Sequence, residues 1–398
     1  MTALPTGLPT GLPLARLTVL EFTHTIMGPS CGTVLADLGA DVIRVEPAPA
    51  GDHTRRLPGF AAGFYMYFNR NKRAVAIDLK TEAGHGVAVD LLKQADVLVE
   101  NFGPGTMERL RLGWEQAHAI NKRLVYCALK GFLPGPYAHR PALDEIAQFM
   151  AGLAYMTGPP GQPLRAGASV VDILGGVMGA VGILAALRQR DRDGEGRKVT
   201  ASLFEAAAFL TGPHMAGEAV TGEAPPPMPA RRSAWGVYET FAAQDGARVF
   251  IGITSDPHWQ AFCAAFGRPD LLADPRFASN TTRVANRDAL REIVAGLAAT
   301  RTAASLSELL DRAGIPFSPV NTPSDLFHDP QIAVRALPVR MADGREVRFP
   351  ALPIAIDDET PGLTRQPPGL GEHTAEVLAA LGYDPARIAA LRADGVVR

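Results

Sequence analysis

The stretch LTVLEFTHTIMGPSCGTVLADLGADVIRVE, residues 17–46, decides the fold of this chain. Apolar and β-branched residues predict one strand at Leu17–Phe22 and another at Asp41–Glu46. The residues between them predict a helix at Pro29–Leu38, with proline in its first turn. Two strands joined by a helix form a βαβ unit, whose strands lie parallel in one sheet.

The same alternation of strands and helices continues as far as residue 129. The further predicted elements are a strand at Ala74–Leu79, a helix at Gly84–Gln94, a strand at Asp96–Glu100, a helix at Trp114–Ile120 and a strand at Leu124–Leu129. Strands that alternate with helices form a parallel sheet with helices on its faces. We therefore expect the α/β class, with a Rossmann-like layer in the N-terminal half.

A proline-rich stretch marks the end of this layer. Thr221–Pro229 reads TGEAPPPMP, which can sustain neither a helix nor a central strand. Beyond it, two apolar runs on either side of QDG at 244–246 predict a hairpin in a smaller α+β domain. We therefore expect a large domain at 1–220, a small domain at 221–335, and a return segment at 336–398 that completes the large domain.

Composition argues against several kinds of partner. The chain has 398 residues with 39 basic and 41 acidic side chains, and this net charge of −2 gives no overall field to attract nucleic acid. Three cysteines far apart in sequence favour a reducing compartment, the cytoplasm, and argue against disulfides. The N-terminus lacks a signal-peptide pattern, and the apolar run Ile173–Leu187 is too short to span a bilayer. We expect this run to be a fully buried helix, with no membrane association.

Asp172 is the most informative residue for function, because it lies between an extended stretch, Arg165–Val171, and the apolar helix. The N-terminus of a helix stabilises an anion, and Gly175 and Gly176 leave room for a bulky ligand close to the backbone. Asp172 is therefore a candidate nucleophile. Aspartate is also a preferred N-cap, however, and its spacing alone favours this structural role.

Other loops predict a ligand site at the carboxyl edge of the sheet. Asn101–Gly105 reads NFGPG and follows the predicted strand at Asp96–Glu100, and Arg109 comes shortly after it. Such a loop suits a phosphate or an adenosine, although an ordinary strand-to-helix turn has a similar composition. The sequence lacks the dinucleotide fingerprint, the ATPase phosphate loop and zinc-type histidine spacings, so we expect no NAD, ATP or metal. His24 and Cys31 are more typical of structural positions.

Several motifs, in the same order along the chain, resemble the family III CoA-transferases. The motifs are LGADVIRVE at 38–46, NKR at 71–73 with DLK at 78–80, NFGPG at 101–105, AQ at 147–148 with MTG at 156–158, and the stretch that ends at Asp172. This group includes formyl-CoA:oxalate and carnitine CoA-transferases and the α-methylacyl-CoA racemases. The resemblance covers nearly the whole chain and implies a homodimer of two interlocked, ring-shaped subunits.

The resemblance also assigns roles to residues. It makes Asp172 the nucleophile that attacks an acyl-CoA thioester, forming an aspartyl–acyl anhydride and then an aspartyl-CoA thioester. Coenzyme A takes part as a substrate, and no permanently bound cofactor is implied. The residues that match coenzyme A contacts of the family are Ile26, Met27, Ile77, Lys80, Asn101, Phe102, Gly103, Arg109 and, within the stretch 141–144, Asp144. Among them, Lys80 and Arg109 would supply positive charge for phosphates.

Departures from the family pattern narrow the reaction. The racemases have a histidine just before the aspartate that corresponds to Asp144, whereas this chain has Leu143. Inversion by proton abstraction needs that second acid–base group, so a racemase or isomerase of the same superfamily is the less favoured alternative. The chain also has Leu57 where the oxalate enzymes have a tryptophan, which argues against oxalate. A further alternative is a non-catalytic CoA-binding protein in which Asp172 caps its helix.

The substrate is suggested by GPPGQPLRAG at 158–167, which resembles transferases for dicarboxylates such as succinate, mesaconate or citramalate. Arginine can hold the second carboxylate of such an acid with two parallel hydrogen bonds. Arg55, Arg165 and Arg231 are the candidates, because they lie near the matched motifs. The sequence therefore predicts an acyl-CoA:carboxylate CoA-transferase for small dicarboxylates.

Overall fold

The computed structural model describes residues 11–341 and 343–398. Contacts between residues divide the chain into two compact units. Unit 1 comprises Met1–Ala230 together with Ala333–Arg398, and unit 2 comprises Arg231–Ile332. In chain order, unit 2 is therefore an insertion in unit 1, with contact boundaries after residues 230 and 332.

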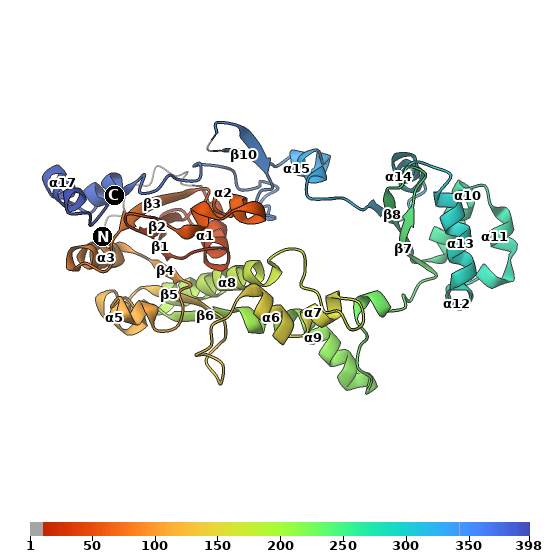
Figure 1. Ribbon diagram of the computed structural model, residues 1–398, viewed down its shortest axis with the longest axis horizontal. Helices are drawn as coiled ribbons and strands as arrows, with labels where there is room; N and C mark the ends of the chain where they lie inside the picture. The colour runs from red at the N-terminus through yellow and green to blue at the C-terminus, as the bar shows by residue number, and fades with distance from the viewer. Residues whose placement is uncertain (1–10, 342) are drawn as a thin grey trace. The chain divides into compact units, whose positions relative to one another are not determined.

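A six-stranded parallel sheet forms the centre of unit 1 (Figure 1). Its strands are β1 (Thr18–Phe22), β2 (Asp41–Pro47), β3 (Lys72–Ile77), β4 (Val97–Glu100), β5 (Val125–Lys130) and β6 (Lys198–Ser202). They lie in the order β3-β2-β1-β4-β5-β6, with every neighbouring pair parallel. The order reverses between β1 and β4, which creates a topological switch point at the carboxyl ends of these two strands. The expected α/β class with a parallel sheet is confirmed.

Helices cover both faces of this sheet, because parallel strands bury both of their sides. The helices of one face are α3 (Glu82–Gln94), α5 (Trp114–Ile120), α16 (Thr374–Ala380) and α17 (Pro385–Ala393). Those of the other face are α1 (Met27–Asp37), α8 (Val170–Asp193) and α9 (Leu203–Thr221). Along β1, Leu20 and Phe22 belong to the first core and Val19 to the second, as the two-residue period of a strand requires.

Glycines allow α8 to lie close to α1. A Cβ atom on Gly175 would come within 2.6 Å of the Met27 side chain, and one on Gly176 within 2.5 Å of the Met27 carbonyl oxygen. The expectation that these two glycines leave room for a ligand is wrong, because α1 fills that space. The close contact instead fixes the start of α8 beside the loop that follows β1.

Helix α8 is 24 residues long, and by length and composition it is apolar enough to cross a membrane. Core helices of globular proteins meet the same criteria, and 44% of its most apolar window is buried inside this protein. The side chains of Ile173, Met178 and Val181 are exposed by 38, 37 and 55% in the single chain. The expectation of a helix buried on all sides is therefore wrong for one copy of the chain.

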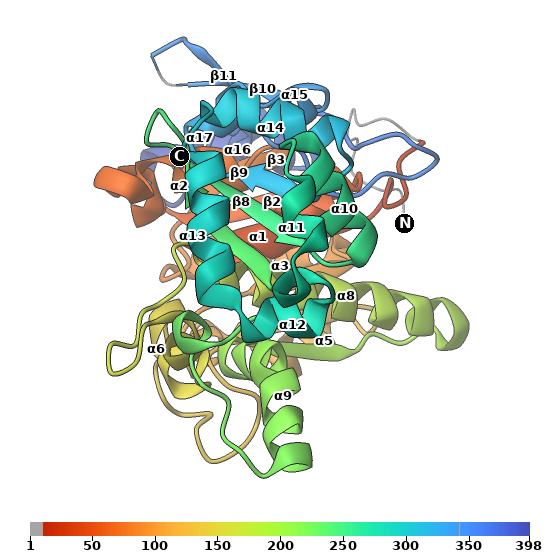
Figure 2. The same ribbon diagram turned by 90° about the vertical axis from the view of Figure 1, so that its right-hand side faces the viewer.

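Shorter elements complete unit 1. They are η1 (His53–Arg56), η2 (Gly59–Gly63), α2 (Phe64–Phe68), α4 (Thr106–Arg109), α6 (Asp144–Met150), α7 (Leu153–Thr157), η3 (Met228–Ala230) and the antiparallel hairpin of β10 (Leu337–Arg340) and β11 (Glu346–Phe349). The second half of α9 extends beyond the rest of the unit (Figures 1 and 2).

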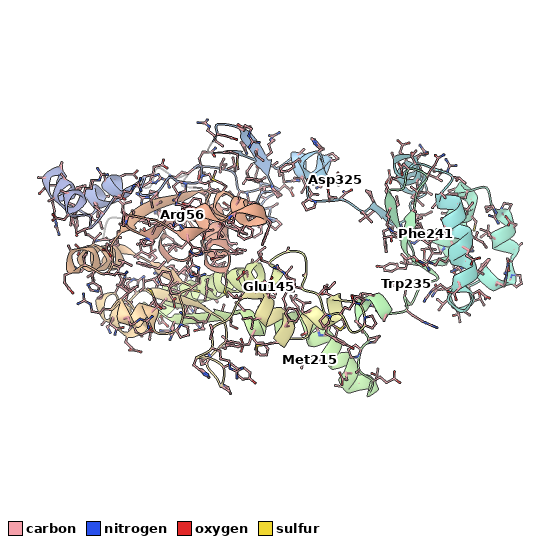
Figure 3. The ribbon with its side chains drawn as sticks, viewed as in Figure 1. Arg56, Glu145, Met215, Trp235, Phe241 and Asp325 are labelled. Atoms are coloured by element: carbon pink, nitrogen blue, oxygen red, sulfur yellow. The ribbon has the colours of Figure 1, made fainter. Side chains whose placement is uncertain are left out.

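Unit 2 is built on a three-stranded antiparallel sheet in the order β7-β8-β9. Its elements are β7 (Val237–Ala242), β8 (Arg248–Ile253), α10 (Asp256–Ala265), α11 (Pro269–Ala273), η4 (Pro275–Phe277), α12 (Asn280–Ala285), α13 (Arg287–Ala298), α14 (Ala303–Arg312), β9 (Phe317–Pro319) and η5 (Asp325–Phe327); α15 (Pro330–Ala333) follows at the boundary. Phe241, labelled in Figure 3, packs in its core with Trp259 and Phe262. The predicted hairpin around residues 244–246 is confirmed.

Candidate active site

A cavity of about 230 Å³ lies at the switch point of the sheet. His24–Met27, directly after β1, and Asn101–Pro104, directly after β4, form two of its walls. Pro141–Asp144, which leads into α6, and Asp172 of α8 form further parts of the lining. The position of the cavity follows from the strand order, because loops that leave β1 and β4 in opposite directions leave a crevice between them.

Asn101 holds the two strand-end loops together. Its side-chain oxygen accepts a hydrogen bond of 3.0 Å from the His24 backbone N–H, and its side-chain nitrogen donates one of 3.0 Å to the His24 carbonyl oxygen. The His24 ring stacks on Phe102, with ring centres 5.8 Å apart. Burial lowers the pKa of His24, so the ring is neutral at neutral pH. Asn101 and Phe102 therefore fix one wall of the cavity.

Asp172 is partly buried and stands in the first turn of α8, three residues after the N-cap Ser169. The pKa of its carboxyl is raised to about 7, chiefly by burial and also by the negative charge of Asp144, and the positive charge of Arg165 opposes both effects. A carboxyl with such a pKa changes its charge near neutral pH. Perturbed groups of this kind, in a cavity, are typical of functional sites.

Asp144, rather than Asp172, caps α8. One oxygen of the Asp144 carboxylate accepts hydrogen bonds from the backbone N–H groups of Val171, at 2.9 Å, and Asp172, at 3.0 Å. Its other oxygen accepts a hydrogen bond from Gln148, whose own oxygen holds the backbone N–H of Ala166 at 2.8 Å. The interpretation of Asp172 as the helix cap is therefore wrong, because a residue 28 positions earlier in the chain satisfies these amides.

Most of the predicted coenzyme A contacts lie at the cavity. Its lining includes Ile26, Met27, Asn101, Phe102, Gly103 and Asp144. Ile77 does not line it, since this side chain is fully buried in the sheet core and its carbonyl oxygen accepts the Ala48 N–H at 3.2 Å. A contact between Ile77 and coenzyme A stays a prediction, which the burial of its side chain does not support.

The two predicted phosphate-binding residues lie on the surface at the same edge of the sheet. Lys80 is exposed in the turn after β3. Arg109 is exposed at the end of α4, the helix that follows the Asn101–Pro104 loop, and donates a hydrogen bond of 2.8 Å to Thr106. Neither residue lines the cavity itself, so any contact with phosphates would be made outside its mouth.

The three candidate arginines have different surroundings. Arg55 makes an ion pair of 2.6 Å with buried Glu46, donates a hydrogen bond of 3.1 Å to the Pro368 carbonyl oxygen and does not line the cavity, and these contacts favour a structural role. Arg165 lies near Asp172 and pairs at 2.8 Å with Glu145 of α6, which is labelled in Figure 3. Arg231 begins unit 2.

Two cations of the cavity were missed from the sequence. Lys130, the last residue of β5, pairs with Glu100 at 2.6 Å and donates to the Phe102 carbonyl at 2.8 Å. Arg140 is exposed and lies over the Tyr137 ring, 4.3 Å from its centre. The position of Lys130 at the end of a predicted strand was a usable signal, whereas Arg140 lies in a loop without a pattern.

No metal cluster accompanies this site in the part of the chain that the structure describes, where no three His, Cys, Asp or Glu side chains are placed together for an ion. The fold and cavity thus define an α/β protein with a cavity at the switch point and a carboxyl of raised pKa within it. The model of CoA-transferase family III matches residues 14–374, and the chain belongs to this family.

Similar proteins agree with this assignment. An acetyl-CoA:oxalate CoA-transferase from Acetobacter aceti is 36% identical over 87% of this chain and 91% of its own length. A succinyl-CoA:mesaconate CoA-transferase from Haloarcula hispanica is 35% identical over 92% of this chain and 96% of its own. The crystal structure of a CaiB/BaiF family protein from Brucella suis matches with a TM-score of 0.83 and 33% identity, covering 93% of this chain and 99% of that one.

Proposed function

We propose that this protein moves coenzyme A between dicarboxylic acids, with Asp172 as the covalent nucleophile. The observation that carries the proposal is that Asp144 caps α8, while Asp172 lines the cavity with a carboxyl whose pKa is raised to about 7. Partial burial of a carboxylate costs stability, and Asp172 is not needed to cap the helix, so structure alone gives no reason for this carboxylate. A covalent role would account for it.

The reaction would proceed in four balanced steps. The Asp172 carboxylate attacks the carbonyl carbon of the acyl-CoA thioester, forming an aspartyl–acyl anhydride and releasing the CoA thiolate. The thiolate attacks the aspartyl carbonyl, which gives an aspartyl-CoA thioester and releases the donor acid as its carboxylate. The acceptor carboxylate attacks this thioester, forming a second anhydride and the thiolate. Attack of the thiolate on the acceptor carbonyl gives the new acyl-CoA and restores Asp172.

The surroundings of Asp172 suit this chemistry. The N-terminus of α8 stabilises the carboxylate that must attack and leave, by ~0.3–2 kcal/mol. Partial burial removes water from the carboxylate, and a more basic carboxylate is a better nucleophile once it is ionised. In the proposed complex, the thiol end of CoA enters the cavity beside Ile26 and Phe102, and its phosphates meet Lys80 and Arg109 outside.

The acids are proposed to be dicarboxylates of four or five carbons, such as succinate, mesaconate or citramalate. Support comes from the mesaconate transferase of Haloarcula hispanica, and the oxalate transferase of Acetobacter aceti also acts on a dicarboxylate. Arg165 is the arginine that stands near Asp172, and its guanidinium could accept a second carboxylate in exchange for the exposed Glu145. A racemase is not favoured, because Leu143 at the cavity cannot transfer a proton.

We further propose that the protein works as an interlocked homodimer in the cytoplasm. The exposed apolar side chains Val181 of α8 and Phe209 and Met215 of α9 support a subunit interface, since they are 55, 69 and 66% exposed in the single chain. Burial of such a surface in a second copy would remove it from water. Sedimentation of the purified protein tests the dimer.

The decisive experiment is to trap the intermediate. The protein is incubated with succinyl-CoA and then with hydroxylamine, which converts an activated carboxyl to a hydroxamate. Peptide mass analysis should find the modification on Asp172, and the Asp172→Asn variant should show none. An unmodified Asp172 in a protein that still exchanges thioesters would refute the proposal, and absence of any exchange with a folded protein would favour a non-catalytic CoA-binding role.

A further inference from the structure

A second cavity, of about 650 Å³, lies next to the first one in unit 1. Ile26 lines both cavities, so a single side chain forms part of the wall between them. Five aromatic side chains surround the second cavity, four from residues 60–68 and one from β11. They are Phe60, Phe64, Tyr67, Phe68 and Phe349.

The aromatic rings support one another in edge-to-face contacts. Phe60 and Phe64 have ring centres 5.7 Å apart, and Tyr67 contacts Phe68 at 4.9 Å and Phe349 at 5.8 Å. Such contacts are favourable beyond the area that they bury. The cavity therefore has an ordered aromatic wall assembled from segments almost 300 residues apart.

The start of α8 places this cavity beside the candidate nucleophile. Asp172 lines the first cavity, whereas Ser169 and Ile173 line the second. By the geometry of an α-helix, Ser169 and Ile173 are rotated about the helix axis by about 60° and 100° from Asp172, both in the same direction. An acyl group carried by Asp172 thus stands next to the opening of the aromatic cavity.

Charge is confined to one part of the second cavity. Among the described residues that line it, Arg165 is the one charged side chain. Its guanidinium contacts Glu145 at 2.8 Å and lies 3.7 Å from the Asp144 carboxylate that caps α8. The polar end of this cavity therefore lies near Asp172, and its other walls are aromatic.

Given the proposed transferase activity, we propose that the second cavity binds an aromatic or branched hydrocarbon substituent of the exchanged acid, a dicarboxylate whose backbone has the four or five carbons proposed above. One carboxyl would react at Asp172, the other would meet Arg165, and the substituent would lie against Phe64, Tyr67 and Phe349. Pockets of about 300–1,000 Å³ hold ligands larger than a four-carbon acid. An unsubstituted succinate would leave these aromatic walls in contact with water.

The first test compares acceptors that differ only in their apolar part. Succinate, methylsuccinate and phenylsuccinate are offered with the same acyl-CoA donor, and CoA transfer is followed by mass. Each buried methylene group should raise kcat/KM about fourfold, and a phenyl ring by tens of fold. Equal kcat/KM for succinate and phenylsuccinate would overturn the inference while leaving the transferase proposal intact, because succinate would still be turned over.

Variants of the wall provide the second test. Phe349→Ala should lower kcat/KM for phenylsuccinate at least tenfold and change that for succinate less than twofold. Gly63→Leu should have the same selective effect by filling space, since a Cβ at Gly63 meets no atom within 4 Å. Phe327→Ala, an exposed residue of unit 2, is the matched control and should change neither value.

Other outcomes identify other occupants. If Phe349→Ala alters both acids equally and also changes the sedimentation of the protein, the cavity is filled by a second copy of the chain, which overturns the inference. If the natural protein transfers no CoA to succinate, the transferase proposal itself fails. The two failures are therefore distinguishable by the succinate reaction alone.

Discussion

The Asp144 carboxylate accepts a hydrogen bond of 3.0 Å from the backbone N–H of Asp172. This bond links a residue at the start of α6 to the first turn of α8, and it satisfies an amide that a local cap would otherwise serve. The same negative charge contributes to the raised pKa of the Asp172 carboxyl. Asp144 thus caps the helix and also makes the Asp172 carboxylate more basic.

Replacing the nucleophile should separate activity from stability. We expect Asp172→Asn to lower the rate of thioester exchange by a factor of about 10³ or more, because no carboxylate remains to form the anhydride. A helix cap would instead cost ~0.5–2 kcal/mol of unfolding free energy and spare the activity. Steady-state assays and urea unfolding of the same preparation measure both quantities, and full activity with reduced stability would contradict the covalent role.

The pH dependence of stability should also report on Asp172. Its pKa is raised from 3.8 to about 7 in the folded protein, so the folded state binds more protons than the unfolded state between these values. Stability from this group is fully present below about pH 4 and is lost as the pH rises through about 7. Above pH 7, Asp172→Asn should therefore be more stable than the natural protein by ~2 kcal/mol. Equal unfolding free energies at pH 8 would refute the raised pKa.

Activity should rise with pH through the same range. Attack on the thioester requires ionised Asp172, so kcat/KM is expected to be half-maximal near pH 7 and level above it. Asp144→Asn keeps an oxygen for the two amides but removes the neighbouring charge, so its half-maximal pH should be lower. A profile that does not move in this variant would show that Asp144 acts through structure alone.

The contact between α1 and α8 should be sensitive to a single methyl group. Gly176→Ala places a Cβ within 2.5 Å of the Met27 carbonyl oxygen, and we expect a loss of ~1–3 kcal/mol together with lower activity, because the start of α8 must shift. Gly217→Ala on α9 is the control, since a Cβ there meets nothing within 4 Å. The control should gain ~0.5–1 kcal/mol from its better helix propensity. Thermal unfolding distinguishes the two.

Replacing the two candidate arginines of unit 1, Arg165 and Arg55, should have different effects. Arg165→Gln is expected to raise KM for dicarboxylates about tenfold or more, with little change for monocarboxylates, because one charged hydrogen-bonding partner is lost. Arg55→Gln should instead lower the unfolding free energy by ~1–3 kcal/mol, since buried Glu46 loses one of its two cationic partners and keeps Arg44 at 3.7 Å. A KM for succinate that is unchanged in Arg165→Gln would exclude this residue from substrate binding.

Local patterns were sufficient for much of the large unit. The strands and the longer helices from Leu17 to Leu129 were predicted to within about two residues, because period and turn chemistry act over short distances, whereas the short helices α2 and α4 were not predicted. Strand β6 and helices α9 and α17 were not predicted. β6 is short, and α9 contains Pro213 and is apolar on several sides, so neither has a clear period.

The sequence alone determined the α/β class, the family, and the position of Asp172 at the start of an apolar helix, since all three depend on residues that are neighbours in the chain. Only the tertiary structure decided what those residues contact. In the folded chain, Asp144 caps α8 and Met27 occupies the space beside Gly176. Arg55 pairs with Glu46, and Phe349 lines a cavity together with residues 60–68. The physical reason is that hydrogen bonds and packing depend on distance in space, which a linear pattern does not contain.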